Sequence, residues 1–172
     1  RYDSTWYVWY PVGSASRDMM ISISANCSPA AAQGVVLDYN FPGQYIDTIT
    51  GLPAVDYSCG DSVIELNFLV KLDCESISED GTDFRLTNPN GQPIPISKLS
   101  ANCDINGETQ AITVHLFKPL LVNGRYFLYS KTGNDGNTLT NKCGFPMNEF
   151  DTLVIIVDDC FEPIWEFENV SV

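Results

Sequence analysis

The sequence contains few basic residues. Its 172 residues include 9 Lys and Arg against 22 Asp and Glu, which gives a formal net charge of −13. Proteins that bind nucleic acid without sequence preference neutralise phosphates with a basic face, and anionic lipid surfaces attract clusters of Lys and Arg. The composition therefore excludes generic nucleic-acid binding and disfavours docking on an anionic membrane.

Several motifs that carry chemistry are also absent. No apolar run approaches the roughly 20 residues of a membrane-spanning helix, so we expect no membrane insertion. A single histidine, His115, and the lack of a Cys-x-x-Cys pair disfavour a zinc site. The chain has no Gly-x-Ser-x-Gly elbow and no phosphate-binding loop, and no pattern places two carboxylates across a cleft. We therefore predict that it is not an enzyme.

What the sequence does contain is short alternating stretches without any helical period. Hydrophobic residues make up 44% and charged residues 18%, which predicts a folded chain. Alternation is clearest where Ile64, Leu66, Phe68, Val70 and Leu72 share one face of a strand. Further strands are expected at 83–87, 94–99, 111–117, 125–130 and 152–157. The pattern predicts an all-β fold, an antiparallel Ig-like β-sandwich of about seven strands.

Turn motifs separate these strands. Asn88–Gly91 and Asp104–Gly107 are typical tight turns. Asn123–Gly124 lies between two apolar strands, and this dipeptide is a strong hairpin signal. The sequence therefore predicts a hairpin that joins 111–117 to 125–130.

The first third of the chain has a different texture. Strands are expected at 5–10, 19–25 and 35–39, and Gly51–Pro53 resembles a linker. Three strands without closing partners are marginal alone. We therefore predict that residues 1–55 are a partial β-rich segment, the tail of a preceding domain, that 56–160 form the sandwich, and that 161–172 lead into a next module. A first residue other than Met predicts a processed or excised piece.

Six cysteines stand at positions 27, 59, 74, 103, 143 and 160. An even count in a β-rich acidic chain predicts disulfides and a location outside the cytoplasm. Strand directions place Cys74, Cys103 and Cys143 at one end of the sandwich and Cys59 and Cys160 at the other. Because bridged cysteines need Cα atoms within about 7 Å, Cys74 should pair with Cys103, or else with Cys143. Cys59 should pair with Cys160, or else with Cys27.

Acidic loops at 73–83, 104–109 and 131–144 should gather at one end of this sandwich. Calcium takes six to eight oxygen ligands from carboxylates and carbonyls on turning backbone. Tight turns use the same residue types, and turn chemistry is the interpretation we favour. The candidate calcium ligands are Asp80, Asp83, Asp104, Asn106 and Asp135.

Four features together resemble a known family. They are the Cys74-Glu-Ser-Ile loop, Asp83–Phe84, the run from Pro119–Leu120 to Gly124-x-Tyr126, and Cys143–Gly144. The combination resembles the bacterial Ig-like domains of the surface-layer type. These are repeated in large secreted proteins of the Bacteroidetes, including gliding-motility-associated adhesins exported by the type IX secretion system. The resemblance covers about residues 59 to 160 and departs from the family pattern at Phe145, where Asn is usual.

The resemblance implies a surface location and partners of the same kind. Secreted proteins of these bacteria carry O-glycans at Asp-Ser/Thr followed by an apolar residue or Thr. Positions that match this pattern are Ser4, Thr48, Ser62 and Thr152. The expected partners are neighbouring modules of the same long chain and the secretion and surface-attachment machinery.

Two functions remain open from the sequence. The first is a structural or adhesive module of a secreted cell-surface protein. The alternative is a carbohydrate-binding module of a secreted polysaccharide-degrading enzyme, in which Trp6, Tyr7, Trp9 and Tyr10 would stack on glycans. Alternation would instead bury one face of this aromatic strand in a core, which is the commoner role of such residues.

Overall fold

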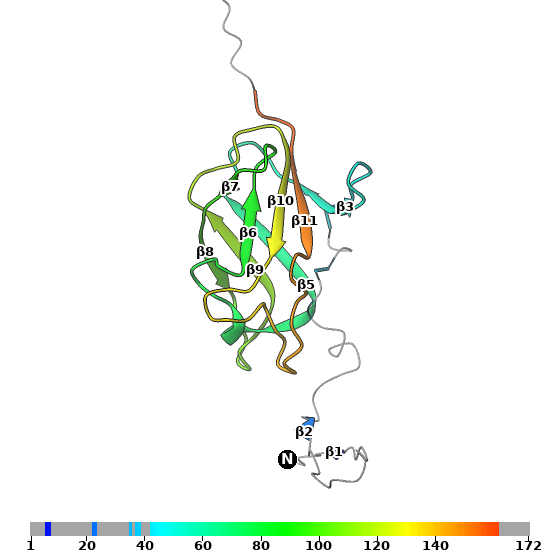
Figure 1. The fold of residues 1–172 in the computed structure, drawn as a ribbon, viewed down its shortest axis with the longest axis vertical. Coiled ribbons are helices and arrows are strands. Elements are labelled where there is room, and N and C mark those ends of the chain that lie inside the picture. Colours follow the sequence, from blue (N-terminus) through cyan, green and yellow to red (C-terminus); the bar gives the residue numbers. More distant parts are fainter. Residues whose placement is uncertain (1–5, 8–21, 24–34, 36, 39–41, 162–172) are drawn as a thin grey trace, which may run out of the picture.

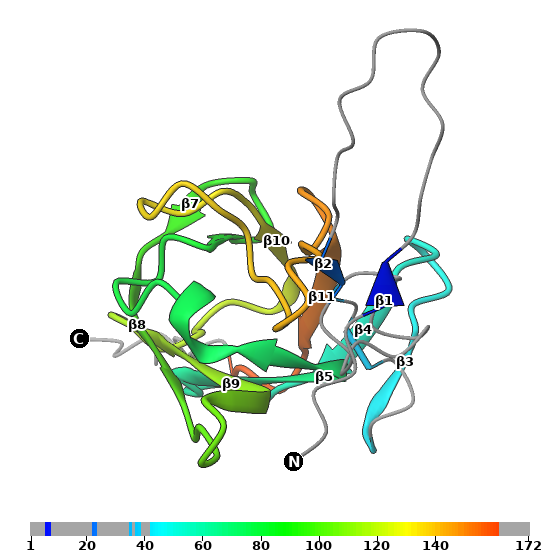
Figure 2. The same cartoon turned by 90° about the horizontal axis from the view of Figure 1, so that it is seen from below.

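The computed structural model describes residues 6–7, 22–23, 35, 37–38 and 42–161 of the chain. Two β-sheets pack face to face around a hydrophobic core, as Figures 1 and 2 show from two directions. The six strands of the larger sheet are, in spatial order, β3 (Gln44–Ile46), β4 (Pro53–Asp56), β11 (Thr152–Val157), β10 (Gly124–Ser130), β6 (Phe84–Thr87) and β7 (Pro93–Ile94). The three strands of the smaller sheet are β5 (Val63–Asp73), β9 (Glu108–Leu116) and β8 (Ile96–Ala101).

The core follows from the alternation in β5. Ile64, Leu66, Phe68 and Leu72 are buried, and the other residues of β5 are exposed or half-buried. From the larger sheet, Leu86 and Leu128 face the same core. Each sheet therefore contributes one apolar face, which is the arrangement of a sandwich.

The connection from β9 to β10 corrects the predicted Asn123–Gly124 hairpin. β9 pairs with β5 and β8, whereas β10 pairs with β6 and β11, so the chain crosses from one sheet to the other. Segment 117–123 is longer than a two-residue hairpin turn, and Leu120 is buried within it. Gly124 is needed for another reason: its φ is 135°, and a Cβ there would lie 2.8 Å from Pro89. The prediction was wrong because it considered only local turn chemistry.

A proline divides another predicted strand. The stretch expected at 94–99 is split into β7, which pairs with β6, and β8, which pairs with β9. Pro95 lies at the break, where its missing N–H and fixed φ suit a change of sheet. The two predicted turns at 88–91 and 104–107 do join β6 to β7 and β8 to β9.

Two features identify the sandwich as Ig-like. The side chain of Tyr126 is buried, and its hydroxyl donates to Val122 O at 2.8 Å and accepts from Val122 N at 3.1 Å. A tyrosine near the start of this strand that bonds the backbone upstream is the tyrosine corner of Ig-like sandwiches. The named strands of the two sheets pair antiparallel except β4 and β11, which run parallel. The predicted Ig-like fold is confirmed, with this parallel pair as an addition.

The expected domain boundary at residue 55 falls inside β4. β3 and β4 belong to the larger sheet, and Ala54 is fully buried beside Val154. Val35 and Leu37 are also buried, through isolated bridges to Met147 and Phe68. Gly51 and Pro53 resemble a linker in sequence, but Gly51 lies in the tight β3–β4 connection and Pro53 begins β4, where it pairs with Ile46. Of the earlier strands, β1 (Trp6–Tyr7) pairs antiparallel with β2 (Ser22–Ile23).

Candidate functional site

A disulfide between Cys59 and Cys160 closes one end of the sandwich. The two Cα atoms are 5.0 Å apart, although the residues are 101 positions apart in sequence. Asn123 holds this end together, because its side chain accepts from Cys160 N at 2.8 Å and donates to Cys160 O at 2.9 Å. Gly60 N donates to Leu120 O in the β9–β10 connection. Asn123 is therefore a clamp on the disulfide and not a hairpin residue.

The β3–β4 hairpin is fastened to the sandwich by an ion pair. Arg125 of β10 donates from Nε and Nη2 to the two carboxylate oxygens of Asp47, each at 3.0 Å. Asp47 is 3% exposed and also accepts from Thr50 N and Oγ1. The Arg125 guanidinium, followed by Thr50, holds the pKa of Asp47 far below its usual range. The contact is a bidentate ion pair, in which two parallel N–H groups of the guanidinium bond the two oxygens of one carboxylate.

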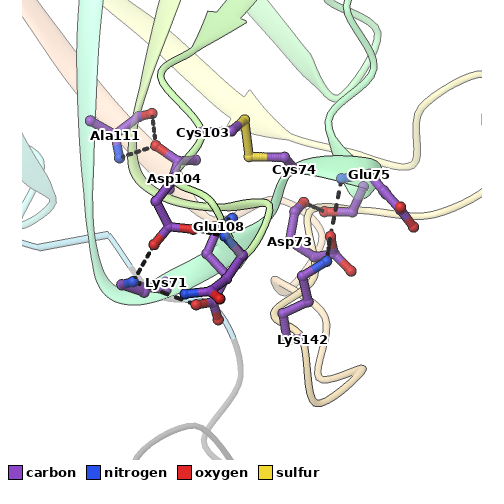
Figure 3. Close-up of a disulfide and its surroundings, with 12 residues drawn as sticks. Lys71, Asp73, Cys74, Glu75, Cys103, Asp104, Glu108, Ala111 and Lys142 are labelled. Carbon is purple, nitrogen blue, oxygen red and sulfur yellow. Dashed lines mark hydrogen bonds and ion pairs between the residues drawn. A yellow bond between two sulfur atoms is a disulfide. The ribbon is translucent and has the colours of Figure 1, made fainter.

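A second disulfide, Cys74–Cys103, closes the opposite end, with 6.4 Å between its Cα atoms (Figure 3). Cys74 begins the short 3-10 turn η2 (Cys74–Ser76) directly after β5, and Cys103 follows β8. Beside the bond, Lys71 pairs with Asp104 at 2.6 Å and Lys142 pairs with Asp73 at 2.7 Å. The hydrogen bond from Lys71 lowers the pKa of Asp104. These pairs join β5 to the loops that surround the bond.

Both bonds join the cysteines that strand direction favoured. Cys143 is also disulfide-bonded, while Cys27 lies outside the described residues. The extended strand β5 separates the two printed bonds, since Cys59 precedes it and Cys74 follows it. Strand direction excluded bonds between the two ends, because cysteines separated by the length of a strand are too far apart to pair. It did not by itself decide between Cys103 and Cys143 for Cys74.

The five calcium candidates do not form one cluster. Asp104 faces Lys71 and accepts from Asn106 N in its own turn. Asp80 accepts from Thr82 and from Asn134 Nδ2. Among the described residues, no group of three or more His, Cys, Asp and Glu side chains is placed to hold a metal ion. In the structure these carboxylates are bonded to nearby N–H and hydroxyl groups, which is the turn chemistry that we favour from the sequence; calcium binding stays a prediction.

Two of the five calcium candidates, Asp83 and Asp135, lie beside Gly133. A Cβ at Gly133 would collide with Asp83 Oδ1 and would lie 2.9 Å from Asp135 Oδ1. Asp83 is buried and accepts from Ser78 N at 2.7 Å and Ser78 Oγ at 3.0 Å. Burial raises the pKa of Asp83 to about 6. Asp83 organises this loop through Ser78.

The predicted modification sites differ in exposure. Thr48 is exposed in the β3–β4 turn, whereas Ser62 and Thr152 are half-buried. Thr152 Oγ1 donates to Phe150 O at 2.7 Å. Ser4 lies outside the described residues, as do Trp9, Tyr10 and residues 162–172. For Trp6 and Tyr7 only the strand pairing is described.

The residues that hold the β3–β4 hairpin and the Cys59–Cys160 bond in place are hard to recognise in the sequence. Asp47 and Arg125 are 78 positions apart, and Asn123 and Cys160 are 37 apart. From the sequence, Asp47 is only the residue before the candidate modification position Thr48, and Asn123 is only part of a turn dipeptide. The Gly-x-Tyr motif did point to Tyr126, whose role as a corner needs the fold to be seen.

Comparison with known proteins adds little. No protein-family model matches the chain, and no curated protein matches it. Among solved structures, the chain is similar to the N-terminal part of the bacterial S-layer protein SbsC, with 14% identity and a TM-score of 0.44. The likeness covers 59% of this chain and 22% of that one, so the chain spans about a fifth of the protein it matches. A likeness this distant carries no argument about function. In the described ranges, the structure contains no helix long and apolar enough to cross a membrane.

Proposed function

We propose that this chain is a load-bearing structural module of a larger protein that works outside the cytoplasm. The observation that carries the proposal is the Cys59–Cys160 disulfide. It closes a covalent loop that includes every strand from β5 to β11. Tension that enters through β4 and leaves after Cys160 passes across one S–S bond, so the chain between the two cysteines is not extended.

Strand β4 lies outside this loop and is placed to resist tension. β4 precedes Cys59 and runs parallel to β11, with Ala54 opposite Val154 and Asp56 opposite Ile156. A pull on the chain before β4, against the chain after Cys160, therefore loads these hydrogen bonds along the strand direction. Bonds loaded in this way share the force, whereas bonds at the end of a peeled hairpin break one at a time. The Arg125–Asp47 pair secures the hairpin that includes β4.

The disulfides also support a location outside the cytoplasm. Structural disulfides persist in oxidising compartments and are rare where thiols are kept reduced. No described cysteine is free. At a cell surface, a spacer or presenting domain is exposed to proteases and to mechanical force. A disulfide at each end of the sandwich would make it more resistant to both.

The finer assignment rests on the sequence resemblance. It would make the chain a module of an adhesin or gliding-motility-associated protein of the Bacteroidetes, exported by the type IX system and presented on the cell surface. Neighbouring modules and the surface-attachment machinery are then its partners. We propose no catalytic role.

Covalent continuity can be tested by cutting the loop. Ile105 lies at the fully exposed tip of the β8–β9 turn, where a recognition sequence for a specific protease can be inserted. After cleavage, a Cys143→Ser chain with a tag at each end should keep both tags in one band on a denaturing gel without reductant, because only Cys59–Cys160 then joins the two pieces. Adding reductant should separate them. Separate bands without reductant would contradict the proposal.

A further inference from the structure

A pocket of about 340 Å³ opens on the outer face of strands β6 and β10. Arg85 and Thr87 share this face because they are two positions apart in β6. Arg85 lies opposite Tyr129 of β10, and Thr87 lies opposite Phe127. Lys131 and Phe150 complete the rim. The pocket lies on β6 and β10 and includes neither disulfide.

The charge of this pocket is opposite to that of the chain. Two cations, Arg85 and Lys131, line it, and neither an Asp nor a Glu does. The net charge of the whole chain is −13. In the described part, Lys71, Arg125 and Lys142 are paired with carboxylates, whereas Arg85 and Lys131, like Lys98 and Lys118, form no such pair; Arg85 and Lys131 differ in lining the same pocket. Two unpaired cations at one pocket of an acidic protein are suited to a carboxylate.

Phe150 is held in a conformation that its own chemistry does not explain. Its φ is 68°, in the left-handed region, and it is the one non-glycine residue with positive φ in the described part. Its side chain is 72% exposed, so burial in the core does not compensate for the backbone strain. Two hydrogen bonds beside it, Phe150 N to Ser130 O and Ser130 N to Asp151 O, fix the turn. Strain held at an exposed aromatic ring points to a contact with a ligand.

The remaining lining is polar and aromatic. Tyr129 stacks on Phe127, with ring centroids 6.2 Å apart, which holds the Tyr129 ring in place at the pocket. The Thr87 hydroxyl makes no hydrogen bond to another described residue, so it is available as a donor and an acceptor. Ser130 Oγ is already bonded to Asn148 O at 2.6 Å. The nearest acids in sequence, Glu149 and Asp151, do not line the pocket, and Glu149 accepts from Thr132.

From this combination we infer that the pocket binds one carboxylate-bearing sugar unit of an acidic glycan. Arg85 and Lys131 bind the carboxylate, the Phe150 and Tyr129 rings contact the apolar face of the sugar ring, and Thr87 bonds a hydroxyl group. A volume of about 340 Å³ is at the small end of ligand pockets, which suits one ring and not a long polymer segment. The site is distant in sequence from residues 6–10, the aromatic strand of the carbohydrate-binding alternative.

Calorimetric titration of the full chain at low ionic strength tests this inference. The probes are D-galacturonate and its trimer, with D-galactose as the ring without a carboxylate and acetate as the carboxylate without a ring. Galacturonate should bind at least tenfold more tightly than either control. Failure of galacturonate to bind, or equal binding of galactose or acetate, would overturn the inference.

Two variants and a control locate the site. Phe150→Gly removes the ring and suits the positive φ, so it should melt no lower than the parent yet bind galacturonate at least tenfold more weakly. Arg85→Gln should weaken binding about tenfold without changing the melting temperature. Lys118→Gln, the same charge change at an exposed position outside the pocket, should leave the affinity unchanged. Parent-like affinity in Phe150→Gly would overturn the inference.

Discussion

Single buried residues decide how this sandwich responds to pH. Asp83 is buried, and its carboxylate accepts two hydrogen bonds from Ser78. Burial outweighs these bonds and raises the pKa of Asp83 from 3.8 to about 6. Because the folded state binds this proton more tightly than the unfolded state, the contribution of Asp83 to stability is fully present below about pH 4. It is lost as pH rises through about 6.

Asp83→Asn should therefore stabilise the protein at pH 8 relative to the parent. The full pKa shift corresponds to about 3 kcal/mol, which solvent screening reduces to about 1–2 kcal/mol. The advantage should disappear near pH 4, where the parent residue is protonated in the folded state. Urea unfolding of both chains from pH 4 to pH 8 measures it. Asp80→Asn is the matched control, because the pKa of Asp80 is lowered by Thr82 and the sign should be reversed. A difference independent of pH would contradict this account.

The tyrosine corner is a second effect of one residue. Tyr126→Phe removes the hydroxyl that bonds both the N–H and the C=O of Val122. We expect a loss of about 1–2 kcal/mol, since both hydrogen bonds to the backbone of Val122 are lost. Chemical denaturation measures this free energy. In Tyr129→Phe, the control, the hydroxyl removed makes no hydrogen bond to a described residue, so the change should stay within about 0.5 kcal/mol.

At the scale of elements, the β3–β4 hairpin depends on its ion pair. Arg125→Met leaves the buried Asp47 carboxylate without its charged partner. The hairpin should open locally, so that amide hydrogens of β4 exchange faster while those of β6 are unchanged. Hydrogen exchange read residue by residue tests this. Lys71→Met removes an exposed ion pair and should not affect β4. Uniform acceleration across all strands in Arg125→Met would mean that the pair supports the whole fold.

Elements differ in how far the sequence could predict them. β5 was predictable because one of its faces is buried along most of its length, so apolar and polar residues alternate clearly in its sequence. The path between β9 and β10 was not, because Asn123–Gly124 reports local turn preference, whereas the burial of Leu120 depends on the opposite sheet. The Arg125–Asp47 contact could not be predicted either, since it joins residues 78 positions apart. Arg85 and Lys131 line one pocket because β6 pairs with β10 and Lys131 directly follows β10, which no local motif indicates.

At the scale of the whole molecule, the two disulfides should contribute unequally. In the chain-entropy model, closing a loop of 101 residues stabilises by about 5 kcal/mol, and a loop of 29 residues by about 3–4 kcal/mol. Cys59→Ser/Cys160→Ser should therefore melt lower than Cys74→Ser/Cys103→Ser. Calorimetric melting of both variants beside the parent measures the difference. The reverse order of melting temperatures would mean that the Cys74–Cys103 end of the sandwich, and not the Cys59–Cys160 end, limits stability.

The most direct measurement of the central claim is the length that the chain releases when it is stretched between Thr48, in the exposed turn before β4, and Phe161, directly after the Cys59–Cys160 bond. With disulfides intact, the segment between Cys59 and Cys160 should release nothing. After reduction the released length should grow by about 33–36 nm, since 101 residues span at most about 3.3–3.6 Å each. Cys74→Ser/Cys103→Ser should match the oxidised parent, because both residues lie within the closed loop. Equal released lengths before and after reduction would contradict the claim that the disulfide carries the load.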